Sequence, residues 1–192
     1  MKIAHPSLLI IPSRRRFLHS GATLSAAAVA LLAGRPSLAA QADARKGDPA
    51  ADARILNTAL AAEHEAIAAY QLGADSGLLR APTRDLALQF QGHHKAHVDL
   101  LAQTVARLGG TPAEKKQKYN FPTGDLKAEA DVLRFASGLE RGAVSAYLGA
   151  VPLFGNPDLA KAAASILGDE AMHWAILRQA LGEDPVPSAF VS

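Results

Sequence analysis

The sequence predicts an all-α protein whose folded part is a four-helix bundle, made of two antiparallel hairpins joined by a long crossover. After residue 48, apolar residues recur every three or four positions in four separate segments, which is the period of a helix with one buried face. Proline and glycine signals bound these segments. The 192 residues include no cysteine, so disulfides and thiolate metal ligands are excluded.

The first pair of helices is expected over residues 49–72 and from Pro82 to about residue 108. Asp48 followed by Pro49 is a helix N-cap with proline at the first helical position, and Gly109 and Gly110 end the second helix. The apolar stripes are Leu56, Leu60, Ile67 and Tyr70 in the first helix, and Leu86, Phe90, Val98, Leu101, Val105 and Leu108 in the second.

The second pair is expected from about Asp125 to Pro152, which stops the helix, and from the N-cap Asn156 to Gly182. The apolar stripes are Val132, Leu133, Ala136, Ala143, Tyr147 and Leu148 in the third helix, and Leu159, Ala163, Ile166 and Leu177 in the fourth. The four helices therefore form one domain over residues 49–182, which a C-terminal tail over residues 183–192 follows.

The lengths of the connections indicate how the helices are ordered. A short turn joins the two helices of each pair, so each pair is an antiparallel hairpin. Between the pairs lies a longer stretch from Gly110 to Thr123, rich in Pro, Lys and Asn. At about 3.3 Å per residue it can run back along a helix of roughly 24 residues, which is about 36 Å long. One long crossover between two hairpins follows from this pattern.

The two hairpins also resemble each other in sequence. The pattern Glu-x-x-Ala-Ile-x-Ala-Tyr from Glu63 to Tyr70 recurs from Glu140 to Tyr147 with Val in place of Ile. The segment that begins at His97 likewise matches the segment that begins at His173. Duplication of an ancestral hairpin would explain these matches, and pseudo-symmetric packing of the core could produce part of them.

Six ionisable residues interrupt the apolar stripes at positions that face the predicted core: Glu63, His94, His97, Glu140, Glu170 and His173. In an antiparallel hairpin, residues at equal distances from the turn lie side by side. Along the chain, the midpoint between Glu63 and the pair His94 and His97 falls inside the first turn. The midpoint between Glu140 and the pair Glu170 and His173 falls inside the second turn. The six side chains should therefore meet near the middle of the bundle. His93 also lies close to the inward face, so a chelating pair of His93 and His97 is an alternative to His94 and His97.

Three of these residues are carboxylates, and the inward stripes carry no Lys or Arg to balance them. An unpaired buried charge loses roughly several kcal/mol of solvation free energy. The carboxylates therefore need positive charge nearby. Two divalent cations would provide it, and a glutamate from each of two helices with Glu-x-x-His segments on the others is a known dinuclear arrangement in helical bundles. A metal-free bundle with buried hydrogen bonds is the alternative.

Residues 1–40 are interpreted as an export signal. The segment Ser13-Arg14-Arg15-Arg16-Phe17-Leu18 resembles the twin-arginine consensus, and a short apolar stretch and a cleavage-like Ser37-Leu38-Ala39-Ala40 follow. The twin-arginine export machinery is then a partner, and the location is periplasmic or secreted. Removing the five basic residues of this segment leaves 15 basic against 18 acidic residues, a formal charge of −3, which argues against nucleic-acid binding. No mature stretch reaches the roughly 18 apolar residues of a membrane span.

Residues 49–182 resemble the ferritin-like superfamily, in particular bacterial ferritin-like domain proteins with a twin-arginine signal, and their helix motifs resemble those of bacterioferritin and rubrerythrin. The resemblance implies a ferritin-like four-helix bundle in which Glu63 and Glu140 are terminal metal ligands and Glu170 bridges two metals. It also implies that His97 and His173 each bind one metal.

The same resemblance implies that Tyr70 and Tyr147 orient the carboxylates through hydrogen bonds, although such tyrosines are more often plain core aromatics. The sequence departs from the family pattern at His94, where a second bridging glutamate is expected. The site could therefore be an imidazole-rich dinuclear centre, a mononuclear site or a degenerate one. Iron is the expected metal, and Mn, Zn or Cu are alternatives.

The function that follows from the resemblance is Fe(II) oxidation or the handling of oxidative stress, with metal ions and O2 or peroxide as partners. Whether the protein is an enzyme is left open, with a ferroxidase-like or peroxide-handling oxidoreductase as the candidate. The alternatives are a non-catalytic metal-binding protein and a structural or interaction bundle with a degenerate site. A homodimer is also left open.

Overall fold

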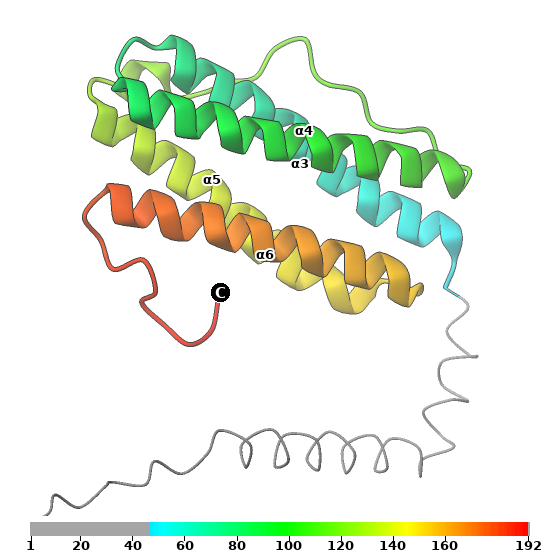
Figure 1. Cartoon of the computed structure of the whole chain (residues 1–192). Helices are drawn as coiled ribbons and strands as arrows, with labels where there is room; N and C mark the ends of the chain where they lie inside the picture. Colours follow the sequence, from blue (N-terminus) through cyan, green and yellow to red (C-terminus); the bar gives the residue numbers. More distant parts are fainter. Residues whose placement is uncertain (1–46, 192) are drawn as a thin grey trace, which may run out of the picture. The chain divides into compact units, whose positions relative to one another are not determined.

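The computed structural model describes residues 47–191, so the predicted export signal lies outside the described residues. Four α-helices make up this part: α3 (Pro49–Asp75), α4 (Ala81–Arg107), α5 (Glu129–Ala150) and α6 (Pro157–Ala180). Short 3-10 helices η1 (Thr123–Asp125) and η2 (Val151–Leu153) are the remaining elements, and residues 47–191 contain no strand. Figure 1 shows the hairpin α3–α4 beside the hairpin α5–α6, with the long connection running along the bundle. The predicted all-α bundle with its crossover is confirmed.

The helix ends differ from the prediction mainly at α5. This helix begins at Glu129 and not near Asp125, because Thr123–Asp125 form the separate 3-10 helix η1. Asp131 then accepts a hydrogen bond of 2.9 Å from the backbone N–H of Ala128 and so caps the first turn of α5. At the other end α5 stops at Ala150, two residues before Pro152.

Matching signals bound the helices in the two hairpins. Asp48 and Asn156 cap α3 and α6, and each accepts a hydrogen bond of 2.9 Å from the N–H two residues on. Gly109 and Gly182 follow the last residues of α4 and α6 with φ of 80° and 75°, a backbone conformation that favours glycine. The equivalent caps agree with the sequence similarity of the two hairpins.

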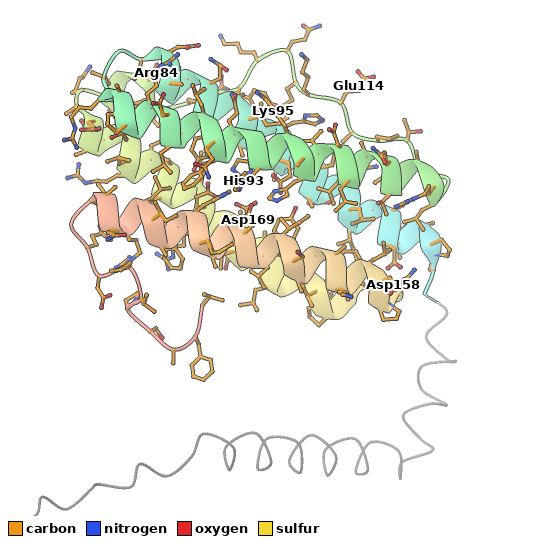
Figure 2. All side chains as sticks on the ribbon, in the orientation of Figure 1. Arg84, His93, Lys95, Glu114, Asp158 and Asp169 are labelled. Carbon is orange, nitrogen blue, oxygen red and sulfur yellow. The ribbon has the colours of Figure 1, made fainter. Side chains whose placement is uncertain are left out.

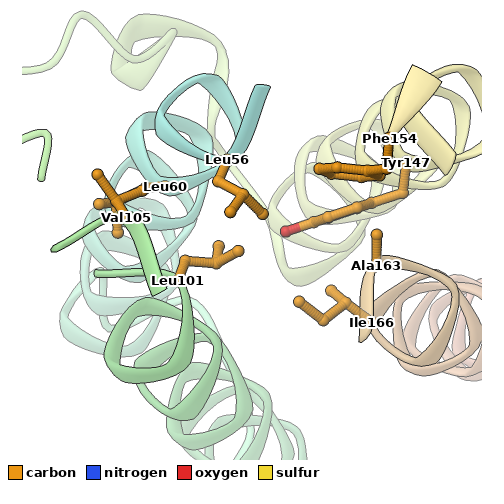
Figure 3. Packing of buried hydrophobic residues seen from close by; sticks show 8 residues of the cluster. All are labelled: Leu56, Leu60, Leu101, Val105, Tyr147, Phe154, Ala163 and Ile166. Carbon is orange, nitrogen blue, oxygen red and sulfur yellow. The ribbon is translucent and has the colours of Figure 1, made fainter. Parts of the chain in front are cut away.

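Two apolar clusters lie at different levels of the bundle. One contains Leu56, Leu60, Leu101, Val105, Tyr147, Phe154, Ala163 and Ile166, which come from both hairpins and face one another in Figure 3. The other contains Tyr70, Phe90, Leu133 and Leu177. Along every helix the residues between these two clusters include the predicted ionisable positions. The bundle therefore has apolar core on both sides of a polar layer.

Buried and half-buried polar contacts connect the parts of the bundle. Asp52 at the start of α3 accepts hydrogen bonds of 3.0 and 3.2 Å from the backbone N–H groups of Gly155 and Asn156 in the α5–α6 turn. Asn57 bonds the crossover through the carbonyl of Thr111 and the N–H of Ala113, at 2.8 and 2.7 Å. These contacts attach both the second hairpin and the crossover to α3.

Among residues 47–191, none of the helices has the length and apolar character that a membrane crossing requires.

Candidate metal centre

The polar layer brings together all six ionisable residues that the sequence analysis selected. Glu63 comes from α3, Glu140 from α5, and the others come in pairs from α4 and α6. Five of the six are at most 3% exposed, and the side chain of His97 is 12% exposed. Polar residues this deeply buried need partners, because an unsatisfied buried group is destabilising.

The first set of possible ligands consists of Glu63, His94, His97 and Glu170. Oε2 of Glu63 lies 2.7 Å from Nδ1 of His94 and 3.4 Å from Nδ1 of His97. Oε1 of Glu170 lies 3.2 Å from Nδ1 of His97. The four residues offer ligand atoms within 4.8 Å of one another, so a single ion could contact all of them.

The second set consists of His94, Glu140, Glu170 and His173. Oε1 of Glu140 lies 3.3 Å from Nε2 of His94 and 3.4 Å from Nδ1 of His173. Oε2 of Glu170 lies 3.4 Å from the same nitrogen of His173. The two sets share His94 and Glu170, and Glu63 and Glu140 belong to one set each. A bridging Glu170 with terminal Glu63 and Glu140 would give such a division, and these roles stay predictions.

The two tyrosines contact the carboxylates of the opposite hairpin. The hydroxyl of Tyr147 in α5 donates a hydrogen bond of 2.7 Å to Oε1 of Glu63 in α3. The hydroxyl of Tyr70 in α3 donates to Oε1 of Glu140 in α5. Both tyrosines are buried. Glu63 and Glu140 are thus each held by a phenol from the other hairpin, and the role of these contacts in orienting metal ligands stays a prediction.

The clustered histidines have raised pKa values in the absence of metal. Burial alone would lower the pKa of His94, but hydrogen bonds with Glu140 and Glu63 raise it to about 10. Burial opposes protonation of His97 and His173 too, and nearby glutamates raise their pKa to about 9. Protonated histidines can therefore supply positive charge to balance the buried carboxylates. The search for Lys and Arg on the inward stripes did not consider this source.

The glutamates respond in two different ways. Burial would raise the pKa of Glu63, but hydrogen bonds with His94 and His97 lower it to about 2. The pKa of Glu140 is lowered for the same reason, with His173 and His94 outweighing its burial. Burial raises the pKa of Glu170, and the neighbouring Glu140 adds to the rise against the opposing histidines.

Glu170 also differs in its hydrogen bonds. Both of its oxygens and Nδ1 of His173 are buried without a partner in hydrogen-bonding geometry, although imidazole nitrogens lie 3.2 to 3.4 Å away. Buried carboxylate oxygens without a correctly placed donor are groups that a bound cation would satisfy. Glu170 is thus the most deeply buried carboxylate of the layer, and no group within residues 47–191 donates a hydrogen bond to it.

A third set of possible ligands was not selected from the sequence: His93, Asp169 and His173. Asp169 precedes Glu170 and lies one turn before His173, but its intermediate position on the helix gave no clear inward signal. None of the ligand sets found in residues 47–191 contains both His93 and His97, the alternative chelating pair. His94, by contrast, belongs to two sets, and whether it binds metal stays a prediction.

His64 is the one histidine of residues 47–191 that belongs to none of the ligand sets. It is half-buried, and its Nε2 lies 3.2 Å from the carbonyl oxygen of Ala113 in the crossover. Glu65 is half-buried as well and lines a cavity of about 540 Å³ between α3 and α5. Apolar residues form most of the wall of this cavity, and it reaches Glu63, His94 and Glu140. The polar layer is therefore accessible to a small molecule from the α3–α5 side.

Comparisons with known proteins agree with this architecture. The sequence profile described as a ferritin-like domain matches residues 51–183. A conserved hypothetical protein from Mycobacterium tuberculosis is 24% identical with a TM-score of 0.65, and the match covers 75% of this chain and 99% of that one. A structure described as ferritin-like, diiron-carboxylate proteins from Bacillus anthracis str. Ames is 20% identical with a TM-score of 0.61, over 71% of this chain and 99% of that one. No curated protein matches the chain.

Proposed function

Because this chain belongs to the ferritin-like domain family, we propose that its polar layer holds two divalent transition-metal ions and acts in Fe(II) oxidation or in the handling of peroxide. The observation that carries the proposal is the pair of overlapping ligand sets that share His94 and Glu170. Each set contains one carboxylate that the other lacks, and Glu170 presents one oxygen to each, as expected of two adjacent ions with Glu170 as their common bridge. The neutral imidazole of His94 can bind only one of the two ions.

The residues fit such ions. The unpartnered oxygens of Glu170 are buried at the point where the two sets overlap, so each oxygen could bind one of the two cations. The combined donors are three carboxylates and three imidazoles, which suit Fe, and also Mn, Zn or Cu. The description of the Bacillus anthracis neighbour as a diiron-carboxylate protein supports iron as the first choice.

Bound iron would supply the exchange of electrons with O2 or peroxide. The protein's own groups have three tasks. Tyr147 and Tyr70 hold the carboxylates of Glu63 and Glu140 in fixed orientations. The apolar clusters above and below the layer exclude bulk water. The cavity between α3 and α5 gives a small neutral molecule such as O2 or peroxide a route to Glu63, His94 and Glu140.

The test is metal analysis followed by oxygen consumption. Purified mature protein should bind more than one equivalent of Fe(II), and adding Fe(II) in air should consume O2 faster than Fe(II) alone. Tyr119→Phe in the crossover is a control that should behave as wild type, because Tyr119 lies outside the polar layer. Protein that takes up no Fe, Mn, Zn or Cu would rule out the proposal.

A non-catalytic metal-binding protein is the second candidate, and the imidazole of His94 favours it. His94 stands where the family pattern expects a second bridging carboxylate, and more imidazole shifts the preference of a site toward Zn or Cu. Stoichiometric binding of Zn(II) without Fe(II)-dependent consumption of O2 would select this candidate over the first.

We also propose that the chain is exported by the twin-arginine route and acts in the periplasm or outside the cell. The support is the segment from Ser13 to Leu18 with its arginine pair. Folding before export would allow the metal ions to be inserted in the cytoplasm. The proposed domain boundaries follow, with a signal over residues 1–40 and the bundle over 49–182.

A further inference from the structure

Three ligand atoms converge on the α4–α6 face of the bundle, just outside the polar layer. Nδ1 of His93 lies 2.9 Å from Nε2 of His173 and 3.0 Å from Oδ2 of Asp169. Nε2 of His173 lies 3.4 Å from the same oxygen of Asp169. Donor atoms bound to one transition metal at about 2.1 Å are roughly 3 to 3.5 Å apart, so these spacings are those of a common coordination sphere.

The three residues of this outer triad differ in their exposure to solvent. The side chains of His93 and Asp169 are 40% and 21% exposed, whereas His173 is 1% exposed. In Figure 2 the two labelled side chains, His93 on α4 and Asp169 on α6, lie between those helices. Two imidazoles and one carboxylate with an open side are a donor set that Fe(II) and related ions accept.

The imidazole of His173 connects the outer triad with the polar layer. Its Nε2 belongs to the triad, while its Nδ1 faces Glu140 and Glu170 at 3.4 Å each. A neutral imidazole has a lone pair on one nitrogen and a proton on the other, so it cannot bind a metal through both. An ion held at the outer nitrogen must therefore leave that position when His173 binds an ion in the layer.

We propose that His93, Asp169 and Nε2 of His173 form a transit site, which captures a divalent transition-metal ion from solvent and passes it to the polar layer. The proposal rests on the proposed function, because the layer is the destination of the ion. The other opening, between α3 and α5, is lined mostly by alanine, glycine and leucine but also by Glu63, Glu65 and Glu140, and we assign it to the small neutral oxidant. Cations and neutral oxidants would then enter from opposite faces of the bundle.

The experiment follows the uptake of Zn(II) by metal-free protein, with stopped-flow detection of a competing chromophoric chelator. His93→Ala should load at least about tenfold more slowly than wild type, because the charged and polar entry is lost, and should reach the same final content. His64→Ala is the matched control, because His64 is the remaining histidine of residues 47–191 and lies outside all three ligand sets. It should load at the wild-type rate.

A second variant isolates the outer triad. Glu170→Gln weakens both ligand sets of the layer and keeps the three donor residues of the triad, so it should retain a single Zn(II) ion that the additional His93→Ala substitution removes. Wild-type loading kinetics in His93→Ala would overturn the transit site, and so would a Glu170→Gln protein that binds no ion while wild type fills its layer. A third result would separate the two proposals. If wild type binds a single ion and His93→Ala loses it, the outer site exists, but the proposed function and the transfer are refuted.

Discussion

Glu140 and Glu170 are both fully buried ligands of the same predicted ion, yet their substitution should affect the metal-free protein very differently. Glu140 accepts a hydrogen bond from Tyr70 and faces protonated His94 and His173 at 3.3 and 3.4 Å. Glu170 has no partner in hydrogen-bonding geometry. We therefore compare Glu140→Gln with Glu170→Gln, since glutamine preserves the shape of the side chain and removes the negative charge.

The size of the difference follows from these contacts. Glutamine at position 140 can still accept from Tyr70, but it loses the charge that faces two imidazolium groups. A hydrogen bond to a charged group contributes about 1.5–3 kcal/mol, so Glu140→Gln should lower the free energy of unfolding by about 2–4 kcal/mol. At position 170 the pKa is already raised by burial, so a neutral side chain should cost less than about 1 kcal/mol. At about 3 °C per kcal/mol, the melting temperatures should differ by at least about 3 °C.

The assay is urea and thermal unfolding of chelator-treated protein, followed by far-UV circular dichroism, with metal content of reconstituted samples measured in parallel. Both variants should lose bound metal, because both residues belong to a ligand set. Only Glu140→Gln should be markedly less stable without metal. Equal destabilisation of the two metal-free variants would refute the reasoning, because Glu170 would then have a structural partner equivalent to Tyr70.

Three further predictions address the export signal, the pH dependence and the departure from the family pattern. Replacing Arg14 and Arg15 together by lysine should abolish export, seen as loss of processed protein outside the cytoplasm; normal export would exclude the twin-arginine route. The histidines of the layer have pKa values raised to about 9–10 from 6.5, so their stabilisation is complete below pH 6.5 and is lost as pH rises through 9–10. Metal-free protein should therefore lose at least about 2 kcal/mol between pH 6.5 and 9 in urea titrations, and flat stability over that range would contradict the assigned charges. His94→Glu should raise the affinity for Fe(II) over Zn(II), because a carboxylate bridge favours the harder ion, and unchanged selectivity in parallel reconstitutions would argue against His94 as a ligand.

Much of the fold could be predicted because its signals are local. Each helix begins at a proline or a capping residue, and its buried face repeats with the helical period, so helix type and order follow from the chain alone. The level at which the site residues meet follows from the same pattern, because antiparallel pairing relates positions by their distance from the turn. The start of α5 was misplaced because Asp125 has the same N-terminal signals as a helix start, whereas the cap comes from Asp131 further along.

The remaining features of the site depend on how each helix is rotated about its axis and on contacts between helices. The periodicity of the sequence specifies neither. Asp169 and His93 lie at the border between inward and outward faces, where a small rotation of α4 or α6 decides whether their side chains meet. The charges of the histidines are equally non-local. They depend on distances to glutamates from other helices, such as Glu63 and Glu140, and so no count of basic residues along the chain could reveal them.

The position of the polar layer explains how one bundle can combine a stable fold with an unsaturated site. Apolar residues such as Leu60 and Val105 on one side of the layer, and Phe90 and Leu177 on the other, bury the surface that drives folding. The layer between them can therefore keep groups such as Glu170 without hydrogen-bond partners, since the two clusters offset their desolvation. Because the hydrophobic contribution does not depend on metal, the protein should fold before it is loaded. The empty ligand sets would then be preformed when an ion reaches them from the α4–α6 face.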